Sequence, residues 1–229
     1  MVAIIAWLTL MVVLGVNSSR ALLEGIGLTA GLSLTVAIVQ FIFMLVFITP
    51  AWRTIWRWVP KLNEWIYPDL NGDWDVELKS NFPRIDALLK SAKGDAPPLD
   101  FRGNESLLPE FGTYKMRARI RQSWAEIEME LWNPAATGPI NESKTLIVEP
   151  FRGKGGRHGL AYVFEQANET DVVSDDSKFR GAAWIERDRD DVNVFCGRMW
   201  TDRMWRLGMN TAADLRFTRQ PSKRLSRRG

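Results

Sequence analysis

The first 50 residues of this chain are almost free of charge, and this feature constrains the fold most strongly. They contain two charged side chains, Arg20 and Glu24, whereas the rest of the chain carries 29 Lys or Arg and 26 Asp or Glu. Charged side chains are strongly disfavoured in hydrocarbon, so the two parts are expected to lie in different solvents. The sequence therefore predicts a membrane anchor at residues 1–50, followed by a water-exposed part.

Two uncharged segments, residues 2–16 and 28–49, are candidates for membrane-spanning helices. The second segment has the roughly 20 residues that are needed to cross the hydrocarbon core, and the first is shorter. A signal peptide is the alternative for the first segment, but it lacks a positive n-region and a second apolar segment follows at once. Because Arg53, Arg57 and Lys61 follow the second segment, the positive-inside rule places both termini in the cytoplasm. We expect a multi-pass protein of the cell inner membrane.

The predicted anchor has no ionisable side chain inside either span, which argues against a self-contained transport pathway. Gly27, Gly31 and Thr35 lie four residues apart. A stripe of small residues allows helices to approach closely, so we predict that these residues support self-association into homo-oligomers. Residues 51–68 form a tryptophan-rich linker, and its helical spacing is typical of an interfacial helix that Pro60 would end.

From residue 69 onward the hydrophobic pattern changes to an alternation with a period of two, which is typical of half-buried β-strands. Eight segments predict an antiparallel, all-β barrel that binds a ligand and covers residues 69–218, because closing the sheet removes its exposed edges. Residues 81–111 interrupt the series and contain a predicted short helix around Ile85, Leu88 and Leu89. The eight predicted strands are residues 70–79, 114–121, 126–131, 144–150, 159–166, 177–187, 191–200 and 207–218.

The C-terminal residues 219–229 carry five basic side chains and no acidic one. We expect a disordered tail that either lies along anionic lipid headgroups or has no binding role. Without this tail, residues 51–218 hold 24 basic and 26 acidic side chains. The soluble domain is therefore not basic overall, and neither DNA nor RNA is an expected partner.

Nothing in the sequence supports catalysis or a metal site. The chain has one cysteine, Cys196, and one histidine, His158, which is too few for the usual zinc ligands. Cys196 alternates with Val192 and Val194, which predicts a small buried residue. We expect no enzyme activity and no cofactor.

Basic side chains occur in two patterns. One runs along a predicted strand from Lys115 to Arg121 and faces the acidic residues of the next strand, which favours ion pairs on the outer face. The other is the segment 151–159, which contains Lys154 and Arg157. It resembles a phosphate loop in composition only, because Gly155 stands where a Walker A loop needs Ser or Thr. It is either a flexible basic hairpin or a turn whose amides, Lys154 and Arg157 bind an anion.

A further set of residues combines flat rings with cations, as a nucleotide ligand requires. Tryptophan is also common core filler, and that alternative remains open. We predict ligand binding by these residues, and we expect Trp200→Ala or Arg203→Ala to abolish it without unfolding. The set comprises Trp124, Tyr162, Trp184, Arg198, Trp200 and Arg203.

The order of these parts resembles a known family. Two N-terminal spans, a tryptophan-rich junction and a strand that opens with Leu70–Trp74 (LNGDW) are similar to the two-transmembrane, β-strand-rich effectors of CBASS anti-phage defence. These proteins are associated with a CD-NTase, an enzyme that makes cyclic nucleotides. The strand that begins with Gly159–Tyr162 (GLAY) and the closing stretches Phe195–Trp200 and Leu215–Phe217 are also similar.

The resemblance implies a specific function. The barrel would bind a cyclic dinucleotide from the partner CD-NTase, the protein would oligomerise, and its spans would disrupt the inner membrane and cause abortive infection. The alternative is a membrane-anchored adaptor whose β-domain docks a protein partner.

Overall fold

The computed structural model describes residues 40–41, 44, 49–99, 102, 105–124, 126–135, 142–153, 155–167 and 177–221. The predicted spans and the small-residue stripe Gly27, Gly31 and Thr35 lie almost wholly outside these residues. Within the described part of the chain, no helix is both long enough and apolar enough to cross a bilayer. The two-helix anchor thus remains a prediction.

The chain divides into two compact units. Residues 1–61 with 123–125 form the first, and residues 62–122 with 126–229 form the second. The described core of the first unit is helix α4 (Ala51–Trp58), which ends before Pro60 and buries Trp52 and Trp56, one turn apart. The ring of Trp56 contacts both Trp52 and Trp124 edge to face, with ring centroids 5.4 Å apart in each pair.

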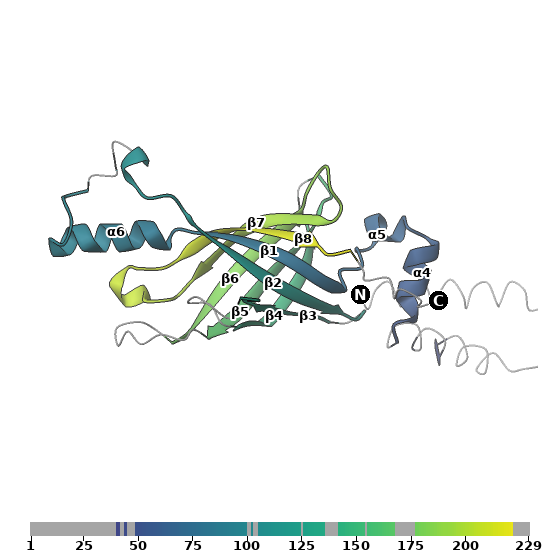
Figure 1. Ribbon diagram of the computed structural model, residues 1–229. Coiled ribbons are helices and arrows are strands. Elements are labelled where there is room, and N and C mark those ends of the chain that lie inside the picture. Colours follow the sequence, from purple (N-terminus) through teal and green to yellow (C-terminus); the bar gives the residue numbers. More distant parts are fainter. Residues whose placement is uncertain are drawn as a thin grey trace, which may run out of the picture. The chain divides into compact units, whose positions relative to one another are not determined.

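The second unit is a closed barrel in which each strand pairs antiparallel with the next and β8 pairs with β1 (Figure 1). This confirms the predicted eight-stranded antiparallel barrel. The last strand includes Arg219, which the sequence placed in the tail. The strands are β1 (Gly72–Ser80), β2 (Gly112–Gln122), β3 (Ile127–Trp132), β4 (Glu142–Arg152), β5 (His158–Ala167), β6 (Lys178–Arg187), β7 (Val194–Thr201) and β8 (Ala212–Arg219).

Large apolar side chains fill the barrel. In β1, β2 and β3 most of the residues that the alternation placed on the inner face are buried. Trp74 packs edge to face on Phe195 at a centroid distance of 5.7 Å. An eight-stranded barrel has an interior just wide enough for side chains. Glycine helps them fit: a Cβ at Gly181 would collide with the ring of Phe164. A ligand must therefore bind at a mouth of the barrel rather than along its axis.

The outer face carries ion pairs, as the sequence predicted, but most of them join other strands than expected. Arg119 Nε lies 2.8 Å from Asp73 Oδ1 of β1, and Arg117 Nε lies 3.8 Å from Asp75. The expected pairing with β3 is represented by Arg121 and Glu130 at 4.0 Å. These basic side chains are thus neutralised by carboxylates rather than available as a phosphate site.

The prediction that Cys196 is buried was wrong. Its side chain is half-buried on the outer face, and Arg216 Nη1 lies 3.7 Å from its Sγ. The alternation was counted from Val192, which lies in the turn before β7 and is 60% exposed. Phe195, rather than Cys196, points into the barrel and is 2% exposed.

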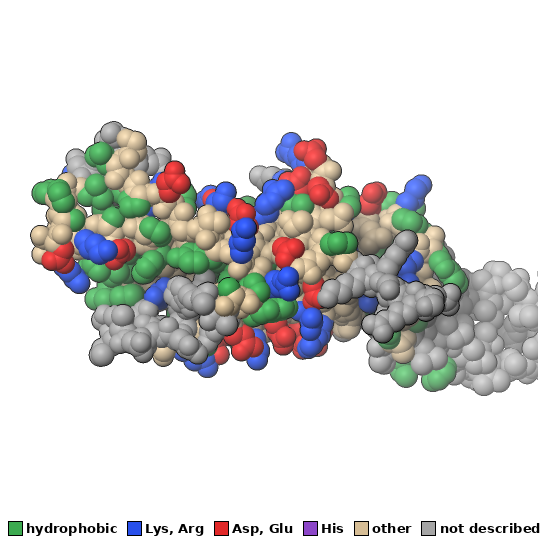
Figure 2. All heavy atoms as spheres, viewed as in Figure 1, with side chains coloured by type: hydrophobic (Ala, Val, Ile, Leu, Met, Phe, Trp, Pro, Cys, Tyr) green, Lys and Arg blue, Asp and Glu red, His purple; other side chains and the backbone are tan. Residues whose placement is uncertain are grey.

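Residues 81–111 contain helix α6 (Phe82–Lys93) and a short 3-10 helix, η1 (Glu105–Leu107). Figure 1 shows α6 extending away from the end of the barrel instead of lying across it. Apolar side chains gather at this end in Figure 2, where Leu107 is 55% exposed, whereas charges of both signs cover the barrel wall. We call this end the α6 mouth; η2 (Trp205–Leu207), between β7 and β8, lies there too.

The opposite end of the barrel, which we call the hairpin mouth, carries the β4–β5 and β6–β7 turns. Helix α5 (Leu62–Trp65) and the residues after it are attached here by several hydrogen bonds. The guanidinium of Arg219 donates to the carbonyl oxygens of Asp69 and Asn71 at 2.7 Å, and the Leu70 amide donates to Gln122 at 2.7 Å. The segment that leads into the barrel is therefore part of its folded unit.

Candidate anion-binding site

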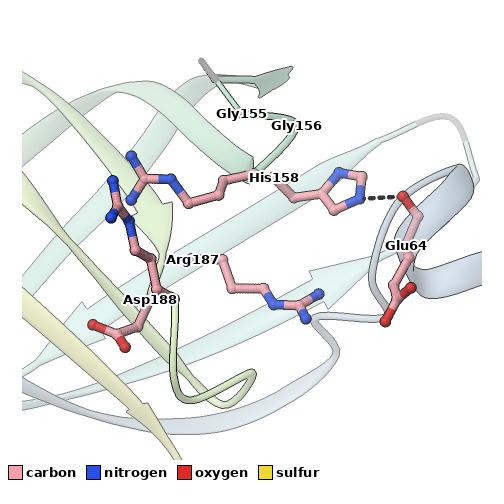
Figure 3. Close-up of a pocket in the computed structure, with 8 residues that line it drawn as sticks. Glu64, Gly155, Gly156, His158, Arg187 and Asp188 are labelled. Carbon is pink, nitrogen blue, oxygen red and sulfur yellow. Dashed lines mark hydrogen bonds between the residues drawn. The ribbon is translucent and has the colours of Figure 1, made fainter.

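An open pocket of about 490 Å³ lies at the hairpin mouth. Its lining comes from three parts of the chain: helix α5, the β4–β5 turn and the start of the β6–β7 turn (Figure 3). We call it the basic pocket, because three of its charged residues are arginines and two are acidic. The lining residues are Glu64, Gly155, Gly156, Arg157, His158, Arg187, Asp188 and Arg189.

The β4–β5 turn forms one wall of the basic pocket. Gly155 and Gly156 have φ angles of +83° and +77°, in the left-handed region that glycine adopts without strain. The Gly156 amide donates to the Gly153 carbonyl oxygen at 3.1 Å, so the turn itself uses this amide. An anion at this wall would therefore be bound mainly by side chains.

Arg157 is held in place by an ion pair. Its Nη2 lies 2.8 Å from Glu186 Oε2. Gly153 makes room for this carboxylate, because a Cβ there would lie 2.9 Å from Glu186 Oε1. Arg157 thus lines the pocket with much of its charge neutralised.

The β6–β7 turn supplies the cations that are free to act. The side chains of Arg187 and Arg189 make no ion pair or hydrogen bond within the described residues. Asp188, between them, accepts the amides of Asp190 and Asp191 at 2.9 Å and 3.3 Å. These hydrogen bonds lower the pKa of Asp188, with a smaller contribution from nearby arginines. Asp188 is therefore a fixed turn residue, whereas the two arginines are available for a ligand.

His158 joins the pocket to α5. Its Nε2 lies 2.9 Å from the carbonyl oxygen of Glu64, which can only accept, so Nε2 carries the proton (Figure 3). Burial lowers the pKa of His158, and the nearby Arg152 and Arg187 lower it further. The imidazole is therefore neutral near pH 7 and acts as a structural donor.

Two further side chains hold α5 against the same place. Arg152, which pairs with His158 across the β4–β5 hairpin, donates from Nη2 to the carbonyl oxygens of Glu64 and Trp65. The Tyr67 hydroxyl donates to the Gly159 carbonyl oxygen at 2.9 Å, and its ring stands edge to face on His158. Burial raises the pKa of Tyr67, so it stays protonated and can donate this bond.

The eight predicted ligand residues do not form a single cluster. Arg157 lines the basic pocket, and Lys154 of the same turn lies outside the described residues. Tyr162 is buried in the barrel core, where it is 5% exposed and burial raises its pKa. Arg203 lies at the α6 mouth, where its guanidinium stacks on Phe82 and Phe179.

The remaining four predicted ligand residues lie elsewhere. Trp184 and Trp200 are on the outer face of the barrel, 43% and 49% exposed. Arg198 is also on the outer face, paired with Asp214 at 3.0 Å. Trp124 belongs to the first unit, against Trp56. None of these four lines the basic pocket.

A second cavity, of about 60 Å³, lies at the α6 mouth beside Arg203. Its polar lining includes Ser80, Gln166, Thr201 and Thr211, and the hydroxyls of the two threonines are 2.6 Å apart. A water molecule occupies about 30 Å³ of liquid volume, so this space fits one or two waters rather than a nucleotide. Of these two cavities, only the basic pocket is large enough for a nucleotide.

The sequence interpretation missed Glu64, Arg152, Arg187 and Arg189. A signal for them existed, because in a closed antiparallel barrel the β4–β5 and β6–β7 turns must lie at the same end. Arg187 directly precedes the turn that the sequence predicted at residues 188–191, and Arg189 lies within it. The sequence carried no signal for the attachment of α5, because the acceptors are backbone carbonyl oxygens, which every residue has.

Within the described residues, no group of three or more His, Cys, Asp or Glu side chains is arranged to hold a metal ion. Comparison of the chain with known protein-family models and with curated proteins found no match.

Proposed function

We propose that this chain is a membrane-anchored receptor for a nucleotide-type anion, which binds in the basic pocket. We further propose that the ligand is a cyclic dinucleotide and that the protein acts as a CBASS anti-phage effector. It is not an enzyme in this account, and its partners are a CD-NTase that makes the ligand, the lipid bilayer and further copies of itself.

The observation that carries the proposal is the pair of unpaired arginines, Arg187 and Arg189, in a pocket of about 490 Å³. Arginine binds phosphate through two parallel hydrogen bonds, and these charge-assisted bonds are roughly twice as strong as neutral ones. The pocket is open, so it can admit a ligand larger than inorganic phosphate. Its size and its cations fit a phosphate-bearing ligand.

The sequence resemblance supplies the remaining steps. Ligand binding would promote oligomerisation, to which close packing at Gly27, Gly31 and Thr35 would contribute. The two predicted spans would then disrupt the inner membrane before phage is released. A ligand can drive such assembly only if it binds the assembled state more tightly than the free state.

A thermal-shift screen of the full chain in nanodiscs against cyclic di- and trinucleotides tests the binding step. We expect one nucleotide to raise the unfolding temperature at micromolar concentration. Arg187→Ala should weaken binding by at least about tenfold, because a hydrogen bond to a charged group contributes roughly 1.5–3 kcal/mol. Arg117→Ala, which removes a cation from the outer face, is the matched control and should bind normally.

Two other variants separate this pocket from the site first expected from the sequence. Trp200 lies on the outer face and Arg203 lies at the α6 mouth. If the basic pocket binds the ligand, Trp200→Ala and Arg203→Ala keep the nucleotide response. Loss of the response in both, with Arg187→Ala unaffected, would move the site to the aromatic residues.

The adaptor is the second candidate, and one observation favours it. Five apolar residues lie side by side in register on the outer face of β4 to β8. Ile147 is 63% exposed and Trp200 is 49% exposed, and exposed apolar patches often mark protein contacts. No stabilisation by any nucleotide would favour the adaptor. The five residues are Ile147, Val163, Ala182, Trp200 and Ala212.

A further inference from the structure

Helix α5 forms part of the lining of the basic pocket, and hydrogen bonds from β4 and β5 hold it there. Its last carbonyl oxygens, those of Glu64 and Trp65, accept hydrogen bonds from Arg152, and the Glu64 oxygen also accepts from His158. Helix α5 has four residues and buries no side chain. These hydrogen bonds to backbone carbonyls therefore contribute to holding α5 in place, together with the segment that follows it.

The Glu64 side chain gives this arrangement an electrostatic bias. It lines the basic pocket, yet its carboxylate makes no ion pair and accepts no hydrogen bond within the described part of the chain. Asp188, the other acidic residue of the lining, is fixed by backbone amides. An anion that enters the pocket is thus repelled by one acidic group that cannot move and by one that can.

We propose that anion binding in the basic pocket releases α5 from the barrel. In the docked state, Arg152 is occupied by the carbonyl oxygens of Glu64 and Trp65, and the Glu64 carboxylate faces the ligand. In the released state, the carboxylate has left and the Arg152 guanidinium is free to bind the anion. The two states therefore have different affinities for the same ligand.

The balance of interactions favours release. Arg152 exchanges hydrogen bonds to neutral carbonyls for charge-assisted hydrogen bonds to an anion, which are stronger. Removal of the Glu64 carboxylate also ends a repulsion between like charges. Because the anion binds the released state more tightly, it shifts the population toward that state.

The inference rests on the proposed function, since it assumes that the basic pocket binds an anion, and it adds the consequence of binding. Residues 59–61 connect α5 to α4 in the chain. Release of α5 therefore lengthens the chain segment that connects the barrel to the predicted membrane anchor. Binding at the pocket thereby changes how the barrel is tethered.

Hydrogen–deuterium exchange of the full chain in nanodiscs tests the release directly, with inorganic pyrophosphate and each cyclic dinucleotide as probes. The reporting amides are those of Ile66, which donates to the Leu62 carbonyl oxygen, and Asp69, which donates to Asn63. We expect a saturating probe to speed their exchange by roughly tenfold, because exchange reports local opening. The exchange rates of backbone amides in the barrel strands should not increase.

Three variants make the test specific. In Arg152→Ala, the Ile66 amide should exchange fast even without a probe, and pyrophosphate should not increase this exchange rate further. Glu64→Gln, which keeps the shape and removes the charge, should bind pyrophosphate more tightly and release α5 less. Arg117→Ala on the outer face is the matched control and should behave as the wild type.

The outcomes separate the two proposals. If a probe binds by calorimetry and the exchange at Ile66 is unchanged or slower, the release is wrong while anion binding stands. If pyrophosphate speeds the exchange but no cyclic dinucleotide binds, the release stands and the nucleotide ligand is wrong. If Arg152→Ala protects Ile66 as well as the wild type does, Arg152 does not hold α5 and the inference fails.

Discussion

His158 has two ring nitrogens in different surroundings, and this asymmetry decides its behaviour. Nε2 donates to the Glu64 carbonyl oxygen, whereas Nδ1 is buried and has no hydrogen-bond partner in the described structure. Protonation at Nδ1 would place a second N–H where no acceptor exists, beside the cations of Arg152 and Arg187. Burial and these two cations lower the pKa of His158.

This lowered pKa predicts a pH dependence of stability. Between the lowered folded value and the unfolded value of about 6.5, the unfolded chain binds more protons than the folded chain. The contribution of His158 is therefore complete above about pH 6.5 and is lost as the pH falls below it. Thermal unfolding of the wild type should show this loss between about pH 7 and 5.

His158→Gln is the matched variant, because a glutamine amide donates to the Glu64 carbonyl oxygen without titrating in this range. Its unfolding temperature should change less with pH than that of the wild type. If the unfolding temperatures of the two proteins change with pH in parallel, titration of His158 does not contribute to the pH dependence of stability. Tyr67 stays protonated throughout this range, because burial raises its pKa.

At the scale of elements, the alternation of residues was enough to predict all eight strands. Buried positions in β1, β2 and β3 alternate as expected, from Trp74 to Leu131. The assignment of residues to the inner or outer face was wrong where the alternation was counted from a residue outside a strand, as for Cys196. Trp184 and Trp200, which the sequence predicted to bind the ligand, point outward.

The inward positions beside these tryptophans explain why the two rings point outward. Ala183, Ile185 and Met199 occupy the inner face, and Gly181 and Gly197 leave space for neighbouring groups. The interior of an eight-stranded barrel cannot hold every large ring in the sequence. Which ring points inward depends on the register of distant strands, and a single sequence does not state that register.

The glycines of the barrel wall give a prediction at this scale. A Cβ at Gly197 would collide with the carbonyl oxygen of Trp184, and it would lie 2.7 Å from the Cα of Ile185. Because both are backbone atoms of the neighbouring strand, they cannot move without distorting the sheet. Gly197→Ala should lower the free energy of unfolding by about 2–4 kcal/mol, above the 1–3 kcal/mol typical of overpacking.

Gly155→Ala provides the contrast for this prediction in urea denaturation. Its Cβ would meet no atom within 4 Å, so its cost comes only from the positive φ of 83°. That cost is roughly 1–2 kcal/mol. Equal losses in the two variants would mean that the strands around Gly197 adjust freely, contrary to the close approach described here.

At the scale of the whole molecule, the chain combines a barrel that the structure describes with an anchor that the sequence predicts. The barrel gives a basic pocket at the mouth where the chain enters this unit. The anchor gives two uncharged segments without a polar pathway, which suit a membrane lesion better than a pump. The link between them is the segment from α4 to Leu70.

The sequence predicted only some of the residues at the basic pocket. It identified Arg157 and the β4–β5 turn, because basic residues and glycines are visible in one short segment. It did not find Arg152 and Glu64, because their roles arise from contacts between residues almost 90 positions apart. Contacts of this kind depend on the closed sheet and on how α5 meets it.

Dye leakage from liposomes that contain the full chain tests whether ligand binding in the basic pocket controls membrane disruption. We predict that the cyclic dinucleotide found in the thermal-shift screen releases the dye from liposomes carrying wild-type protein or Arg117→Ala. Liposomes carrying Arg187→Ala should stay intact at the same ligand concentration. Leakage that is independent of ligand, or that Arg187→Ala shows equally, would contradict a membrane effector controlled by the basic pocket.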